Sequence, residues 1–189
     1  MRIVFFGAPG SGKGTQAAIL KNTFGIPHIS TGDLLRGHVA RCTELGRKAK
    51  AVMEAGQLVS DDLVLGMLED RLAEADAKPG FILDGYPRNL IQADALGALL
   101  ARIGQPLDIV IKLNVPNEAI LERCAKRFAE QGRKDDDPEV VRGRLAVYAE
   151  QTAPVAAFYT RAGKLVEIDG VGELASVTAR ILAAVESAA

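Results

Sequence analysis

The chain has 189 residues, of which 48% are hydrophobic and 25% are charged, and its formal net charge is −1. These values are ordinary for one soluble globular domain, and a nearly neutral chain gives no general electrostatic reason to bind nucleic acid or a membrane surface. The two cysteines, Cys42 and Cys124, suggest neither a disulfide framework nor a zinc site. No apolar run has the length of a transmembrane helix or of a signal-peptide core, so we expect a cytoplasmic protein with reduced thiols.

The elements predicted along the chain alternate between strands and helices. Apolar runs of strand length occur at residues 3–6, 81–83, 109–115 and 165–168, with a shorter candidate strand at 27–30. Helical patterns occur at residues 13–23, 61–75, 90–103, 116–130, 138–161 and 173–187. Pro116 and Pro138 suit the first turns of two of these helices, and Ser60 suits an N-cap. The alternation predicts an α/β fold with a doubly wound, five-stranded parallel sheet in which the apolar runs are interior strands.

Two segments do not follow this alternation. Residues 31–59 contain helical pieces but no convincing strand, and we interpret them as a small helical insertion. Residues 131–137 combine a glycine with a run of charged residues and are predicted to be irregular. Ligands of doubly wound sheets bind beyond the carboxyl ends of the strands. Because Gly7, Thr31 and Asp84 each follow a predicted strand, we expect a binding site among them.

The strongest motif is a glycine-rich loop at residues 7–15, Gly-Ala-Pro-Gly-Ser-Gly-Lys-Gly-Thr, between the first predicted strand and helix. This is a Walker A loop, whose backbone N–H groups and Lys13 bind the phosphates of a nucleoside triphosphate. The general motif places Ser or Thr directly after the lysine, whereas Gly14 intervenes here and the hydroxyl arrives at Thr15. A chance glycine-rich turn is the alternative, and the order of strand, loop, lysine and helix argues against it.

A carboxylate and an arginine follow the predicted strand 81–83. Asp84 stands where proteins with such a loop hold Mg²⁺, directly or through water, because a hard cation prefers oxygen ligands. The alternative is a turn-forming Asp before Gly85. Arg88 lies four residues further on, and its guanidinium could bridge two phosphate oxygens in the cleft. A solvated surface arginine is the alternative for Arg88.

Several arginines in the second half of the chain form a further candidate set. Arg123 and Arg127 are four residues apart and share one face of a predicted helix, where anionic phosphates would offset their repulsion. Arg133 lies in the charged loop. Arg142 and Arg144 cannot both point at one site, and Arg142 is the better surface candidate. For any single arginine the alternative is a surface ion pair that contributes little stability.

Together these motifs resemble the adenylate kinase family over essentially the full chain. The match includes the loop with its inserted Gly14, Ser-Thr-Gly-Asp-Leu-Leu-Arg at residues 30–36, Gly-Gln-Leu-Val at 56–59 and Asp-Gly-Tyr-Pro-Arg-Asn at 84–89. The resemblance implies a P-loop nucleoside monophosphate kinase that converts ATP and AMP into two ADP with Mg²⁺. It also implies a monomer without zinc, and no nucleic-acid or membrane partner.

The resemblance also assigns residues to the two nucleotides. It implies that ATP is bound by Gly10, Ser11, Gly12, Lys13, Gly14, Thr15, Arg123, Arg127 and Gly172. It implies that AMP is bound by Thr31, Arg36, Gln57, Leu58, Val59, Gly85, Tyr86, Pro87, Arg88, Gln92, Arg133 and Arg144. The predicted ligands of Mg²⁺ are Asp84, through water, and Thr15. The groups expected to neutralise the transferring phosphoryl group are Lys13, Arg88, Arg123, Arg133 and Arg144. We expect no general base, because the acceptor is already a phosphate anion, and His28 and His38 are assigned structural or surface roles.

The resemblance further implies one P-loop kinase domain with two mobile parts. The core would comprise residues 1–29, 60–126 and 137–189, with an AMP-binding insertion at 30–59 and a lid at about 127–136. Adenylate kinase is a standard example of lid closure over an active site. Only residues 128–132 separate Arg127 from Arg133, so the chain is similar to the short-lid form of the family.

Three other functions remain open from the sequence. A UMP/CMP kinase shares the fold and the short lid, but it usually carries Ala where this chain has Thr31 and Asn where it has Gln92. A regulator that binds ATP without turnover would not need Lys13, Arg88 and the lid arginines together. A kinase for a small-metabolite hydroxyl would need a different acceptor region and a base. We therefore predict that AMP is the preferred acceptor.

Overall fold

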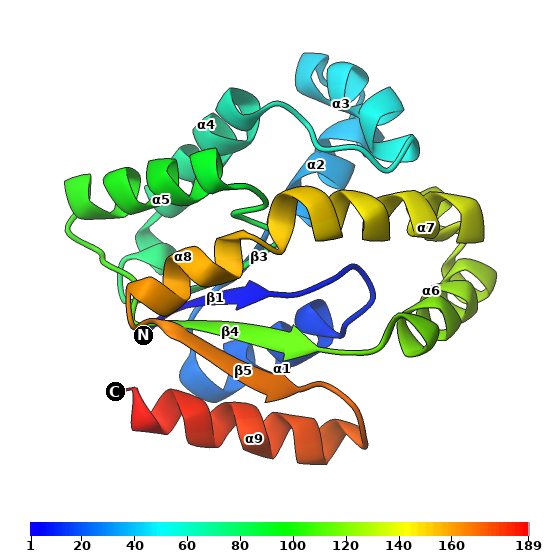
Figure 1. The fold of residues 1–189 in the computed structure, drawn as a ribbon. Helices are drawn as coiled ribbons and strands as arrows, with labels where there is room; N and C mark the ends of the chain where they lie inside the picture. Colours follow the sequence, from blue (N-terminus) through cyan, green and yellow to red (C-terminus); the bar gives the residue numbers. More distant parts are fainter. Residues whose placement is uncertain (189) are drawn as a thin grey trace.

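One parallel sheet organises the structure. The computed structural model describes residues 1–188, and its five strands are arranged in the order β2-β3-β1-β4-β5 (Figure 1). The strands are β1 Arg2–Phe6, β2 His28–Ser30, β3 Phe81–Asp84, β4 Ile109–Asn114 and β5 Leu165–Asp169. The predicted α/β class and the five-stranded parallel sheet are confirmed. The prediction of an interior strand at 165–168 was wrong, because β5 lies at an edge and most of its residues are partly or fully exposed.

Helices cover both faces of this sheet. They are α1 Lys13–Phe24, α2 Thr31–Ala40, α3 Glu44–Glu54, α4 Asp61–Leu72, α5 Leu90–Arg102, α6 Asn117–Gln131, α7 Pro138–Val147, α8 Val155–Arg161 and α9 Leu174–Ser187. Short 3₁₀ turns occupy Ala75–Ala77 and Lys134–Asp136. In Figure 1, α1 and α9 lie below the sheet and α5 and α8 lie above it. None of the helices in residues 1–188 is long and apolar enough to cross a membrane.

The strand sequence divides the core into two layers, because successive side chains of a strand point to opposite faces. From β1, Val4 and Phe6 pack above the sheet in one buried cluster that also contains residues of α4 and α5. Ile3 and Phe5 pack below it in a second cluster with residues of α1 and α9. Since β1 lies between β3 and β4 and is covered on both faces, the loop that follows it at Gly7 starts from a rigid base.

The predicted helix at 138–161 is interrupted. A π-helical turn, Tyr148–Thr152, follows α7, and the Ala153 N–H donates to the Tyr148 carbonyl at 2.8 Å. Pro154 explains the break, because proline has no N–H and its ring would clash with the carbonyl four residues earlier in a regular helix. The prediction of one continuous helix was therefore wrong.

Two of the predicted helix starts also differ in detail. Pro138 is in the first turn of α7, as the sequence predicted, and the Asp137 carboxylate caps that helix by accepting from the Glu139 N–H at 3.0 Å. Pro116 instead precedes α6, which begins at Asn117. Ser60 precedes α4 but its side chain makes no capping hydrogen bond.

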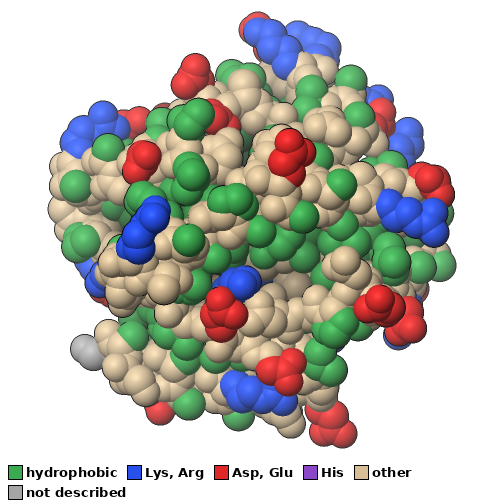
Figure 2. Space-filling model, viewed as in Figure 1, with side chains coloured by type: hydrophobic (Ala, Val, Ile, Leu, Met, Phe, Trp, Pro, Cys, Tyr) green, Lys and Arg blue, Asp and Glu red, His purple; other side chains and the backbone are tan. Residues whose placement is uncertain are grey.

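The surface shows no segregation of charge on the face drawn in Figure 2, where acidic and basic side chains are interspersed. One group of basic side chains lies at the top of this view, over the position of α3 in Figure 1. The sequence of α3 includes Arg47, Lys48 and Lys50. Lys48 pairs with Glu44 four residues earlier at 2.7 Å, so part of this charge is compensated within the helix.

Close packing between α2 and α3 depends on Gly46. A Cβ atom at Gly46 would lie only 2.1 Å from the carbonyl oxygen of His38, which belongs to the backbone and cannot move aside as a side chain could. We predict that Gly46→Ala destabilises the protein by about 1–3 kcal/mol through overpacking. Denaturant unfolding followed by circular dichroism measures this change.

Gly66→Ala is the matched control, because Gly66 is also helical but a Cβ atom there would meet no other atom within 4 Å. Replacing a helical glycine with alanine in open space should stabilise the protein by about 0.5–1 kcal/mol. Equal effects of the two substitutions would contradict the proposed close approach of α2 and α3.

Candidate active site

A cavity opens beyond the carboxyl ends of β1 and β3, where the order of the strands reverses beside β1. We call it the phosphate-loop cavity. The predicted site residues that line it are Gly10, Gly12, Lys13, Gly14, Thr15, Arg36, Leu58, Asp84, Gly85, Tyr86, Pro87, Arg88, Arg127, Arg133 and Arg144. The fold thus gathers residues from the loop after β1, the loop after β3 and the segment 127–144 around one space.

The phosphate loop has the backbone that its sequence predicts. Gly7, Gly10 and Gly12 have φ values of +143°, +77° and +98°, a region that side chains other than glycine rarely adopt. At Gly10 a Cβ atom would also lie 2.7 Å from the sulfur of Cys124 in α6. The loop is therefore held between β1 and α6 and leads into the N-terminus of α1, whose partial positive charge favours an anion.

Lys13 is folded back over this loop. Its Nζ donates to the carbonyl oxygens of Gly7 and Ala8, both at 2.8 Å. Burial lowers the pKa of Lys13 to about 8, with Asp84 opposing the shift and nearby arginines adding to it. The amine therefore carries its charge at neutral pH and loses it within the weakly alkaline range.

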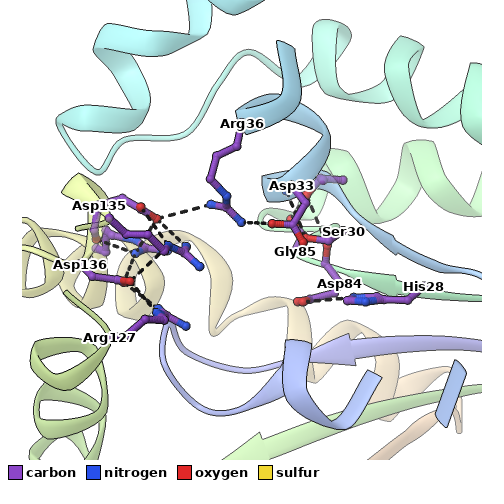
Figure 3. Close-up of polar contacts among 12 residues, drawn as sticks. His28, Ser30, Asp33, Arg36, Asp84, Gly85, Arg127, Asp135 and Asp136 are labelled. Atoms are coloured by element: carbon purple, nitrogen blue, oxygen red, sulfur yellow. Dashed lines mark hydrogen bonds and ion pairs between the residues drawn. The ribbon is translucent and has the colours of Figure 1, made fainter. Parts of the chain in front are cut away.

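Asp84 ends β3 and faces the same cavity. Its Oδ2 lies 3.5 Å from His28 Nε2 (Figure 3). Burial raises the pKa of the Asp84 carboxyl, but the His28 contact and the charges of Lys13 and Arg88 outweigh it, so the pKa stays below its ordinary value. An ionised carboxylate and the Thr15 hydroxyl in the same cavity fit the oxygen ligands that Mg²⁺ prefers. His28, for which a structural role was predicted, thus lies against Asp84 at the edge of the cavity.

An adjoining cavity is lined by the other predicted residues of the acceptor side, namely Thr31, Gln57, Val59 and Gln92, together with Arg36, Leu58, Gly85, Arg88 and Arg144. Thr31 Oγ1 and Arg88 Nε both donate to the Gly85 carbonyl oxygen, at 3.0 and 2.6 Å. Burial lowers the pKa of Arg88 to about 10, which still leaves the guanidinium charged at neutral pH. Arg88 and Arg144 border both cavities.

Asp136 is the centre of an arginine cluster that the sequence analysis missed. Its carboxylate is fully buried and accepts two hydrogen bonds from Arg127, at 2.5 and 2.6 Å (Figure 3). Arg133 and Arg144 approach the same carboxylate at 3.2 and 3.4 Å. The acidic run at 135–137, which directly follows Arg133 and Lys134, is the signal that could have revealed this role.

Asp135 extends this cluster toward the insertion. It pairs with Arg133 at 3.0 Å, with Arg144 at 3.2 Å and with Arg36 of α2 at 3.6 Å (Figure 3). Burial raises the pKa of the Asp135 carboxyl. The three arginines lower it by more than burial raises it, so the pKa lies below its ordinary value. The carboxylate therefore joins residues of the segments 30–59 and 127–136 across the adjoining cavity.

Three predicted residues lie outside both cavities, namely Ser11, Arg123 and Gly172. Arg123 instead donates to the carbonyl oxygens of Ser11 and Gly170, at 3.3 and 3.1 Å, and so connects the phosphate loop to the loop after β5. Arg142 pairs with Glu139 at 2.7 Å on the surface, as predicted.

Asp136 gives a test of what holds the arginines together. We predict that Asp136→Asn destabilises the protein by about 3 kcal/mol, because removing one partner of a buried ion pair leaves uncompensated charge. Thermal and denaturant unfolding measure this. Glu139→Gln removes an exposed carboxylate–arginine pair and should leave the stability nearly unchanged. A similar loss in both variants would contradict a special role for the buried carboxylate.

The comparisons with known proteins agree with this geometry. The family model described as adenylate kinase matches residues 5–164. An adenylate kinase from Stenotrophomonas maltophilia (strain R551-3) is 61% identical over 98% of this chain and 100% of its own length. One from Xanthomonas oryzae pv. oryzae (strain MAFF 311018) is 62% identical over 96% of this chain and 97% of its own length. They support the adenylate kinase predicted from the sequence rather than a UMP/CMP kinase, and this chain belongs to the adenylate kinase family.

Proposed function

We propose that the protein transfers a phosphoryl group from MgATP to AMP and forms two ADP. The observation that carries this proposal is the pair of adjoining cavities, one beginning at Lys13 and the other reaching Gln92, which share Arg36, Arg88 and Arg144. Two anionic nucleotides bound in these cavities would meet at the three shared arginines. This arrangement suits transfer between two phosphates better than transfer to water or to a small hydroxyl compound.

The chemistry requires positioning and charge neutralisation rather than proton transfer. Lys13 and the N-terminus of α1 would bind the terminal phosphates of ATP. Arg123 would hold the phosphate loop in place through its hydrogen bond to the Ser11 carbonyl oxygen. Arg88, Arg133 and Arg144 would neutralise the moving phosphoryl group and the AMP phosphate. The acceptor phosphate is already anionic at neutral pH, so no side chain has to act as general base.

Magnesium fits the oxygen ligands on the donor side. Asp84, through water, and the Thr15 hydroxyl would hold it near the ATP phosphates. When bound, the ion would supply positive charge to the phosphate oxygens.

The remaining assignments are part of the same proposal. Residues 30–59 would close over AMP, and residues 127–136 would form the short lid. Asp135 and Asp136 would hold the arginines of this lid in place until phosphates take up part of their hydrogen bonds. A cytoplasmic monomer without zinc remains our prediction, as do the ATP-side positions of Ser11, Arg127 and Gly172.

An acceptor panel tests the proposed reaction. With MgATP as donor, we expect kcat/KM for AMP to exceed the values for CMP, UMP and GMP by more than about tenfold, the discrimination expected from base-specific hydrogen bonds. A coupled ADP assay provides the measurement. A clear preference for CMP or UMP would replace the proposed acceptor.

The buried lysine predicts a pH dependence. Because Lys13 has a pKa of about 8 in the free enzyme, kcat/KM for ATP should fall as the pH rises, by roughly fivefold between pH 8 and pH 9. Lys13→Arg should be slower but should lose this decline, because guanidinium stays charged. A wild-type profile that is flat to pH 9.5 would contradict the assignment.

Two alanine variants test whether the site catalyses transfer or only binds nucleotide. Lys13→Ala and Arg88→Ala should each lower kcat by at least about a hundredfold, because each removes charge stabilisation of the transferring group. Unfolding curves check that both variants remain folded. Undiminished turnover in both would refute their catalytic roles.

A further inference from the structure

The side-chain amide of Gln92 is held at both ends. Gln92 lies in the first turn of α5, is 2% exposed and lines the adjoining cavity. Its Oε1 accepts a hydrogen bond from the backbone N–H of Arg88 at 2.7 Å. Its Nε2 donates to Oδ1 of Asp61, also at 2.7 Å. The amide therefore has one partner on each side before any ligand binds.

These two partners permit only one orientation of the amide. A backbone N–H can only donate, and an ionised carboxylate can only accept. Rotating the amide by half a turn would set N–H against N–H at Arg88 and oxygen against oxygen at Asp61. Both mismatches would fall on the buried amide of Gln92, where an unsatisfied polar group is costly. The orientation of Gln92 is thus determined by groups at its two ends.

Asp61 is itself fixed in place. Asn89 Nδ2 donates to its two carboxylate oxygens, at 3.1 and 3.3 Å. The Oδ1 of the same asparagine accepts from the backbone N–H of Gln92 at 2.8 Å and caps α5. Asp61 also begins α4, whose N-terminus favours a negative charge. A side chain from α4 therefore controls a side chain of α5 that faces the cavity.

The fixed amide leaves one Nε2 hydrogen and one Oε1 lone pair for a ligand. A 6-aminopurine presents an acceptor at N1 beside a donor at the 6-amino group, which complements this arrangement. A 6-oxopurine presents the reverse, a donor at N1 beside an acceptor at O6. A purine edge read by Gln92 would therefore be accepted or rejected according to the orientation that Asp61 imposes.

We propose that Asp61 is a positioning residue for base selection, which orients Gln92 so that the acceptor cavity takes a 6-aminopurine monophosphate and rejects a 6-oxopurine monophosphate. This inference rests on the proposed function, because it assumes that Gln92 contacts the base of AMP. A purely structural Asp61, which only ties α4 to the cap of α5, would affect stability without altering the choice between bases.

The test compares AMP with IMP as acceptors, using the full chain and MgATP. In Asp61→Asn the neutral amide can both donate and accept, so the reversed Gln92 would meet a mismatch only at the Arg88 N–H. We expect the ratio of kcat/KM for AMP to that for IMP to fall by about tenfold, the effect of weakening one charge-assisted hydrogen bond. The KM for AMP should carry most of the change, while the KM for ATP should stay within about twofold, since the donor side does not contact Asp61.

Two variants act as controls. Asp62→Asn neutralises the exposed acid next in the chain, for which the structure gives no contact with Gln92, and should keep the wild-type ratio. Asp61→Glu retains an acceptor-only carboxylate and should recover most of the selectivity lost in Asp61→Asn. If Asp61→Glu recovers the AMP-to-IMP ratio, the orientation of the Gln92 amide, rather than the packing of the side chain at position 61, determines the selectivity.

Several outcomes would overturn the inference. An AMP-to-IMP ratio within twofold of wild type in a folded Asp61→Asn would do so. If that variant does not fold, Asp61→Ser, which puts a smaller neutral side chain at the first residue of α4, takes its place; failure of both to fold would show that Asp61 acts on the fold. A wild-type enzyme that prefers CMP or UMP would instead remove the proposed function, whereas a preference for AMP with an unchanged ratio removes this inference alone.

Discussion

The structure must hold several positively charged side chains close together around the phosphate-loop cavity in the absence of a bound phosphate. Lys13, Arg88 and Arg144 all border one cavity, and burial lowers the pKa of each. Without compensation these cations would repel one another and draw water into the site. Three carboxylates oppose this. Asp84 lies near Lys13 and Arg88, and Asp135 and Asp136 pair with Arg144.

One of these carboxylates, Asp135, also connects parts of the chain that the proposed function would require to move. Asp135 links α2 of the insertion with the segment after α6, because Arg36 and Arg133 share it. Lys134 adds a second link to α3 through Glu54 at 3.3 Å. These contacts are partly or largely exposed, so each contributes little stability by itself. Weak individual contacts suit two segments that, in the proposed function, would separate and close again during each turnover.

Much of this architecture follows from local signals in the sequence. The order of apolar strand, glycine loop, Lys13 and helix predicted β1, the phosphate loop and α1, because each signal lies within a few neighbouring residues. Contacts between residues that are far apart in the sequence leave no comparable local pattern. The contact of Asp84 with His28 joins residues 56 positions apart, and that of Asp61 with Gln92 joins residues 31 positions apart. The π-helical turn left little trace in the sequence, because the helical pattern of residues 138–161 continues on both sides of Pro154.

In the proposed function, separate groups bind the phosphates and read the base, which would let one small site combine affinity with selectivity. Phosphates are common to all nucleotides, so the arginines and Lys13 can provide affinity but little discrimination among acceptors. Discrimination needs a group with a defined donor and acceptor arrangement, and a freely rotating amide would not provide it. Asp61 and the Arg88 N–H remove that freedom at Gln92. Since Arg88 contributes its guanidinium to the charged cavity and its backbone to the amide, a shift of this one residue would disturb phosphate binding and base selection together.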